Sequence, residues 1–176
     1  MFPVLGYMMW YNMAYLWCLN KWKRNIDITE EDHKFGLRMH YESKVDPEVR
    51  EHLDKFAKWL RREFVFPLRV NVYVKAARWI KAQDGDMVAG TILRSADYHE
   101  CPYIRLATGD YPDLVMELGR DRAILAILHT FAHELTHYYQ RINALALTYR
   151  GEERQAKSYA DDIILEYIEV SELQYP

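Results

Sequence analysis

The sequence predicts an α+β fold, in which a small and mostly antiparallel sheet packs on helices. The order of the patterns supports this: one helical pattern comes first, three segments of strand character follow, and residues 113 to about 173 are helical in periodicity. The chain has 176 residues, half of them hydrophobic, which suits one domain with a sizeable core.

The chain begins with a segment unlike the rest. Residues 1–20 carry no charge, and Lys21, Lys23 and Arg24 follow at once. The length could span a bilayer with the remaining chain in the cytoplasm, but the many Tyr and Trp residues favour an interface over the bilayer core. We therefore separate residues 1–24, a hydrophobic aromatic N-terminal segment, from a domain of residues 25–176. Membrane attachment through residues 1–20 stays open but is not favoured.

The first helix is predicted from Asp46-Pro47 to about Glu63. Asp46 caps the helix and Pro47 occupies its first position. One buried face is indicated by apolar residues three and four positions apart, namely Val49, Leu53, Phe56, Ala57 and Leu60. Residues 25–44 are polar and mixed, so they predict turns or a short helix.

Three strands are predicted, at residues 67–75, 87–93 and 102–107. The first alternates, with Leu68, Val70, Val72 and Val74 on one side. Asp84-Gly85-Asp86 predicts the turn before the second strand.

Charge and cysteine content narrow the function. The net charge of −3 gives no strongly basic surface, so we expect no nucleic acid partner. Two Cys residues exclude a disulfide framework and a Cys-rich zinc site, and a cytoplasmic location is the expectation.

The chemistry lies in residues 133–137, which read His-Glu-Leu-Thr-His. Two His residues four positions apart lie on one face of a helix and can bind one Zn²⁺ ion. Glu134 between them can accept a proton from a water molecule at the metal. An apolar stripe falls on the other side of this helix and consists of Ile124, Leu128, Phe131, Leu135, Tyr138 and Ile142.

A catalytic zinc ion usually has three protein ligands. Glu152 and Glu153 begin the next helical segment and are the candidates for the third. We favour Glu153, because it shares a helix face with Ala156 and Ala160, whose small side chains allow a close approach. Both acids could instead be present only because the helix dipole favours them there.

Other candidates are weaker. His129 lies one turn before His133 and could hydrogen-bond a ligand or substrate, although a solvated His is the simpler reading. Tyr149 and Tyr159 could donate a hydrogen bond to the oxyanion of the transition state. The remaining histidines lack metal-ligand spacing and are expected at the surface, namely His33, His40, His52 and His99.

The His-Glu-Leu-Thr-His motif followed by Glu153-x-x-Ala156 resembles the gluzincin zinc metallopeptidases, in particular the minigluzincins and the ImmA/IrrE-like peptidases. The resemblance covers roughly residues 120–165. It implies a zincin-like domain with His133, His137 and Glu153 as zinc ligands, Glu134 as general base and an antiparallel edge strand that pairs with an extended peptide. Close relatives of thermolysin have Asp four residues after the Glu ligand, whereas this chain has Lys157.

The leading hypothesis is a zinc-dependent peptidase that acts on a peptide or protein. One alternative is a non-catalytic domain in which zinc staples two helices. Another is a regulatory protease specific for a single partner protein.

Overall fold

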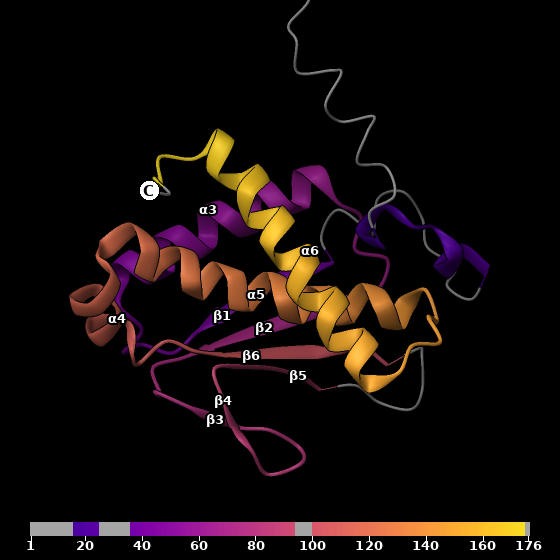
Figure 1. Cartoon of the computed structure of the whole chain (residues 1–176), viewed down its shortest axis with the longest axis horizontal. Coiled ribbons are helices and arrows are strands. Elements are labelled where there is room, and N and C mark those ends of the chain that lie inside the picture. The colour runs from indigo at the N-terminus through magenta and orange to yellow at the C-terminus, as the bar shows by residue number, and fades with distance from the viewer. Residues whose placement is uncertain (1–15, 25–35, 94–99, 175–176) are drawn as a thin grey trace, which may run out of the picture.

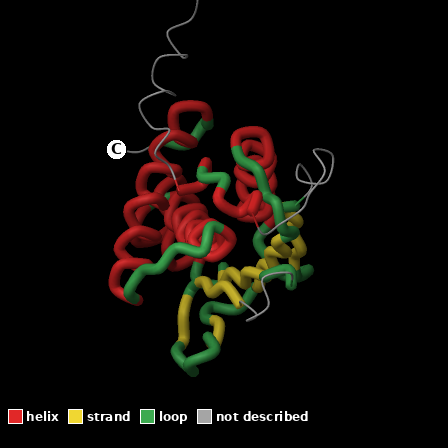
Figure 2. The backbone as a smooth tube through the Cα atoms, turned by 90° about the vertical axis from the view of Figure 1, so that its right-hand side faces the viewer, coloured by secondary structure: helices red, strands yellow, loops and turns green. Residues whose placement is uncertain are grey.

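The computed structural model describes residues 16–24, 36–93 and 100–174. It has two layers, with helices packed on one face of a four-stranded sheet and a small hairpin below the sheet (Figure 1). Figure 2 shows the same separation from the side, with the helices gathered away from the strands. The predicted α+β class is therefore confirmed.

The helices follow the expected order. Their bounds are η1 Leu16–Cys18, η2 Lys21–Arg24, α3 Pro47–Glu63, α4 Tyr111–Leu118, α5 Arg120–Ile142 and α6 Tyr149–Val170. Helix α3 has the predicted limits, and the Asp46 side chain accepts a hydrogen bond from the Glu48 amide. The helical region that we expected from residue 113 is divided at Gly119, whose φ of 84° is accessible to glycine at little cost.

The sheet differs from expectation in its strand directions. The strands are β1 Leu37–Tyr41, β2 Val70–Lys75, β3 Ile80–Lys81, β4 Met87–Val88, β5 Gly90–Leu93 and β6 Tyr103–Ala107. In the order β1-β2-β6-β5 the first two pairings are parallel, and only β5 and β6 are antiparallel. The prediction of a mostly antiparallel sheet is therefore wrong for this sheet. Helix α3 connects β1 to β2, and such a crossover allows neighbouring strands to run in parallel.

Two strand predictions also need correction. Residues 37–41 form β1, in a region where we expected turns or a short helix. The single strand expected over residues 87–93 is two strands, because β4 pairs with β3 and β5 pairs with β6.

The core lies between the sheet and the helices. The predicted apolar stripe of α5 is buried along its whole length, with exposed fractions of 0–2%. On α6, Ala156, Ala160, Ile164 and Tyr167 are also buried, as expected for the face that follows Glu153.

Residues 16–24 belong to this core. Leu16, Trp17 and Trp22 are buried, and the Trp17 indole stacks on Tyr139 with centroids 4.9 Å apart. The Trp17 indole N–H also donates to Thr136 Oγ1 at 3.1 Å. The segment that we separated from the domain therefore supplies core side chains, while residues 1–15 lie outside the described part.

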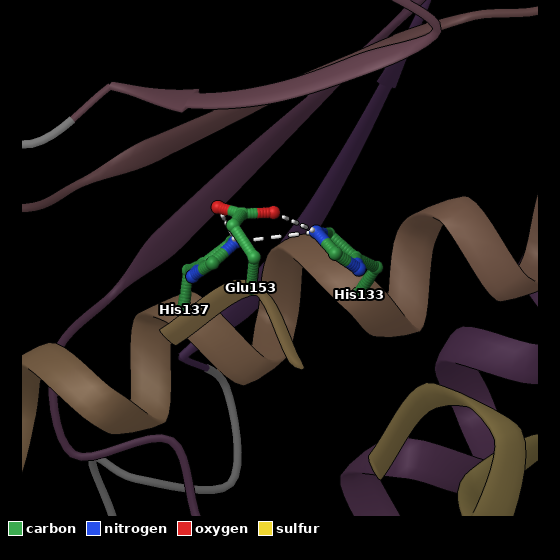
Figure 3. A group of neighbouring side chains, drawn as sticks. All are labelled: His133, His137 and Glu153. Carbon is green, nitrogen blue, oxygen red and sulfur yellow. Dashed lines mark hydrogen bonds and ion pairs between the residues drawn. The ribbon is translucent and has the colours of Figure 1, made fainter. Parts of the chain in front are cut away.

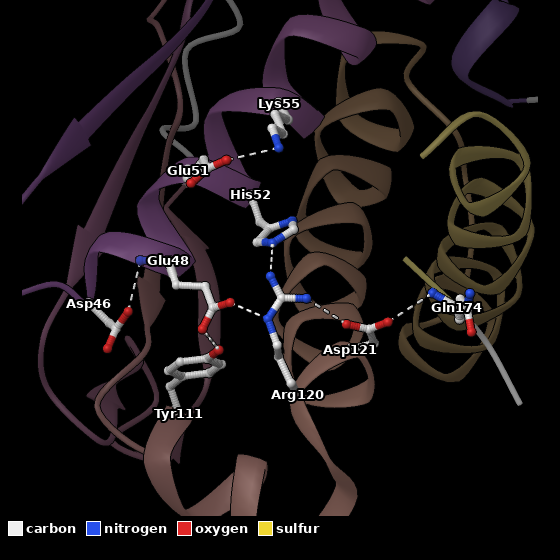
Figure 4. A network of polar contacts seen from close by, with 9 residues as sticks. All are labelled: Asp46, Glu48, Glu51, His52, Lys55, Tyr111, Arg120, Asp121 and Gln174. Atoms are coloured by element: carbon white, nitrogen blue, oxygen red, sulfur yellow. Dashed lines mark hydrogen bonds and ion pairs between the residues drawn. The ribbon is translucent and has the colours of Figure 1, made fainter. Parts of the chain in front are cut away.

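A polar network joins the ends of three helices (Figure 4). Arg120 at the start of α5 donates to Glu48 and contacts His52, while the Tyr111 hydroxyl donates to Glu48 at 2.6 Å. The hydrogen bond from Tyr111 lowers the pKa of Glu48. His52 is only 6% exposed, so its expected surface position is wrong; burial and the neighbouring guanidinium lower its pKa.

Among the described residues, none of the helices combines the length and apolar character that crossing a bilayer requires. Most of residues 1–20, on which the membrane alternative rests, lie outside that part of the chain.

Candidate metal centre

Three side chains from two helices meet at one point (Figure 3). His133 and His137 stand one turn apart on α5, and Glu153 reaches over from the first turns of α6. His133 Nε2 and His137 Nε2 are 3.2 Å apart. Each carboxylate oxygen of Glu153 lies 3.3 Å from one of these nitrogens. One donor atom from each residue falls within a group 4.8 Å across.

These separations match the donor spacing around a zinc ion. Zn²⁺ binds His nitrogen and carboxylate oxygen at about 2.0–2.2 Å in tetrahedral geometry, which puts neighbouring donors roughly 3.3–3.5 Å apart. The two imidazole nitrogens, and each nitrogen with its nearer Glu153 oxygen, are separated by 3.2–3.3 Å, close to that value; one donor atom from each of the three residues falls within 4.8 Å of the others. The donor set of two imidazoles and one carboxylate therefore fits zinc, with a fourth position left for another ligand.

The local sequence explains how Glu153 reaches the histidines. Thr148 caps α6, and its side chain accepts a hydrogen bond from the Gly151 amide at 3.2 Å. Ala156 and Ala160 are fully buried, so α6 approaches α5 closely on the side that carries Glu153. The structure brings Glu153, rather than Glu152, to the two His side chains.

Gln140 is a residue of the site that the motif did not reveal. Its Nε2 group donates to the Glu152 carbonyl at 3.0 Å, and its Oε1 atom lies 2.7 Å from His137 Nδ1. Because a carbonyl can only accept, the amide must face Glu152 with its nitrogen and His137 with its oxygen. His137 Nδ1 therefore carries a proton, which leaves Nε2, the nitrogen that faces Glu153, as the atom that can bind a metal.

The state of His133 also suits metal binding. Burial lowers the pKa of His133, and the neighbouring His137 lowers it further, while Glu153 acts in the opposite direction. The lowered pKa favours the neutral imidazole, which is the form that binds a metal.

Glu134 lies under the edge of the sheet. Its side chain is 7% exposed. A Cβ atom on Gly90, the first residue of β5, would come within 2.7 Å of Thr130 Cγ2 and 3.3 Å of Glu134 Oε1. Glycine at this position therefore lets the edge strand β5 pass directly over the Glu134 carboxylate.

His129 has a different partner. Its Nε2 atom lies 2.8 Å from Asp161 Oδ1 on α6, and Lys157 Nζ contacts the other oxygen of Asp161 at 3.3 Å. The structure joins His129 to this ion pair rather than to the group formed by His133, His137 and Glu153.

The two Tyr candidates occupy different positions. Tyr149 is 75% exposed and precedes Glu153 by four residues, so both lie on one side of α6. Tyr159 is half-buried against the core and follows Glu153 by six residues, which turns it about 120° away around the helix. Of the two tyrosines, Tyr149 is the better placed to contact a molecule bound next to Glu153.

Comparisons of the chain with protein-family models, curated proteins and solved structures found no match.

Proposed function

We propose that this protein is a zinc-dependent peptidase of the gluzincin type, with His133, His137 and Glu153 as the zinc ligands. The observation that carries the proposal is that His133 Nε2 and His137 Nε2 lie 3.2 Å apart with a different Glu153 carboxylate oxygen 3.3 Å from each, while the buried Glu134 is not one of this group. Three protein ligands are the usual set for a catalytic zinc ion, whereas structural zinc normally has four.

The roles of the residues follow from this arrangement. Zinc, when bound, polarises a carbonyl and lowers the pKa of a water molecule towards about 7. Glu134 accepts the proton of the attacking water on its carboxylate and passes it to the leaving amine. Gln140 keeps His137 in the tautomer that can bind metal.

The substrate in this proposal is an extended peptide. Strand β5 is the last strand of the sheet in the described part of the chain, and it runs antiparallel to β6. An extended chain can pair with such an edge through main-chain hydrogen bonds. Because Gly90 of β5 lies against Glu134, a peptide paired there would have its backbone close to the general base.

A non-catalytic domain is the rival function. The cluster joins α5 to α6, as a zinc staple would, and Gln140 already links the same two helices through the Glu152 carbonyl. A regulatory protease with one partner protein is a narrower form of the peptidase proposal, and it would leave generic peptides uncut.

The test compares zinc content and peptide cleavage in the same samples. We expect Glu134→Gln to keep zinc and lose activity by roughly 10²–10⁴-fold, because Gln retains the size but cannot accept a proton. Glu153→Ala should lose zinc, whereas the neighbouring Glu152→Ala should keep it.

Each rival predicts a different result. A protein that holds zinc but cleaves neither a peptide library nor its natural partner is a stapled domain. Cleavage of the partner alone identifies the regulatory protease. If neither Glu variant loses zinc, the gluzincin assignment is wrong.

A further inference from the structure

The outer face of the four-stranded sheet carries a second candidate site. Helices α3 and α5 contact the strands from the inner side, and α6 packs on α5; Figure 2 shows the helices gathered on one side of the strands. The alternation of side chains along a strand places a different set on the outer face. This outer set, here called the aromatic–basic face, consists of Arg38, His40, Asn71, Tyr73, Tyr103 and Arg105.

The charge of this face is opposite to that of the whole chain. The strands β1, β2, β5 and β6 contain Arg38, Lys75 and Arg105 and no acidic residue. Glu42, just after β1, pairs with Lys75 at 3.1 Å, which leaves the two arginines in excess. The chain as a whole has 26 acidic and 23 basic residues, so these strands differ from the average in lacking acidic side chains rather than in having many basic ones.

The side chains of the face hold one another in place. The His40 and Tyr73 rings stack with centroids 4.8 Å apart, and the Tyr103 ring meets Tyr73 edge-on at 5.9 Å. His40 also hydrogen-bonds Asn71 at 3.0 Å, and Arg105 donates to the Lys81 carbonyl at 2.8 Å. Rings that are already ordered lose little conformational entropy when a partner binds.

Two general observations make this face unusual for a surface exposed to water. Parallel strands are normally covered on both sides, yet the helices cover one side of the parallel strands β1, β2 and β6, and on the other side the β3–β4 hairpin contacts β6 at Arg105. Tyr73 and Tyr103 nevertheless remain 37% exposed. Tyr and Arg are also the residues enriched where proteins bind one another.

We propose that the aromatic–basic face binds an acidic peptide segment of a partner protein. The three strands that carry this face, about 4.8 Å apart and about five residues long, cover roughly 10 by 16 Å, well below the about 800 Å² that each side of a standard protein interface buries. The area therefore fits a segment better than a whole domain. The rings of His40, Tyr73 and Tyr103 contact one another, so few of their faces are open. This disfavours the stacking of nucleic acid bases on them. The proposal does not depend on the activity of the metal centre.

The probe for this proposal is a random dodecapeptide phage library, selected on the full-length protein. We expect enriched peptides to be rich in Asp and Glu, and to shift the backbone amide signals of β1, β2 and β6 in ¹H–¹⁵N spectra. Arg38→Glu, and separately Tyr73→Ala, should weaken binding at least tenfold. Lys58→Glu is the matched control, because it reverses a charge on α3 in the helical layer, and it should change binding less than twofold.

Three other outcomes would contradict the binding of an acidic peptide to this face. Selection without acidic enrichment, or no selection at all, overturns the proposal. Equal losses from Arg38→Glu and Lys58→Glu would mean that only overall charge matters. If a dodecathymidine oligonucleotide shifts the same amides and the acidic peptides do not, the face binds nucleic acid instead.

Discussion

At the scale of single residues, Gln140 decides how His137 can act. Its amide is locked by two unlike partners, an N–H of His137 and a carbonyl of α6. The same side chain therefore sets the His137 tautomer and ties the backbone next to Glu153 to α5. A residue that hydrogen-bonds the second ring nitrogen of a metal-binding His commonly fixes the orientation of that ring and raises its basicity.

We predict that Gln140→Leu lowers zinc affinity by about 10–100-fold, the usual effect of losing such a partner. Leucine leaves the buried His137 Nδ1–H and the Glu152 carbonyl without this hydrogen-bonding side chain. The measurement is a competition titration of zinc with a chelator. Gln155→Leu is the control, because Gln155 also accepts from Gln140 but leaves the Glu152 contact in place. Equal zinc affinity in wild type and Gln140→Leu would remove Gln140 from the site.

The sequence predicted the His133, Glu134 and His137 group because its spacing is local to one helix. Glu153 could be proposed from the alanines that follow it, since they indicate a close helix pair. Gln140 could not, because its role exists only once the first turn of α6 arrives beside α5. A polar residue three positions after His137, in a helix otherwise buried there, was the available signal.

At the scale of elements, the approach of β5 to α5 places Gly90 against Glu134, the proposed general base. Side-chain alternation identified most of the strands, but it carries no information on strand direction, so the parallel pairings could not be predicted from it. The break between β4 and β5 likewise depends on which neighbour each strand pairs with. Gly90 lies at this break, where the edge strand crosses Thr130 and Glu134.

We predict that Gly90→Ala lowers peptidase activity by about 10²-fold while zinc content is unchanged. The new methyl group would lie 2.7 Å from Thr130 Cγ2, so β5 or the Thr130 side chain must shift, and it would also crowd Glu134 Oε1 at 3.3 Å. A displacement of this size at a reacting group can cost about 10²-fold. The measurement is kcat/KM on a cleaved peptide with zinc assayed in parallel.

The steric cause can be checked by rescue. Thr130→Ser removes the obstructing methyl group and should restore part of the activity of Gly90→Ala. Thr91→Ala, one residue along β5, should have little effect. Failure of Thr130→Ser to recover any activity would show that crowding at Thr130 is not the cause.

At the scale of the whole molecule, residues 16–24 contact α5, the helix that carries His133 and His137. Composition distinguished this segment but could not show that its aromatic residues fill a gap beside α5. Trp17 packs between Tyr139 and Phe64, with centroid distances of 4.9 and 5.0 Å. Its indole N–H reaches Thr136, the residue before His137. The helical turn of α5 that carries His137 is thus covered by residues more than 100 positions away in the sequence.

We predict that Trp17→Ala lowers the free energy of unfolding by about 3–5 kcal/mol, the usual loss for a buried aromatic residue in a core. Trp17 is 2% exposed, so its removal leaves a cavity against Tyr139 and Phe64. Trp79→Ala is the matched control, because Trp79 is 47% exposed, and it should cost less than about 1 kcal/mol. The measurement is urea unfolding at a fixed zinc concentration, since bound metal itself stabilises the folded state. A chain that begins at Asn25 should be destabilised at least as much as Trp17→Ala. If Trp17→Ala instead unfolds at the same urea concentration as Trp79→Ala, residues 1–24 are separable from the domain, and the division at residue 24 stands.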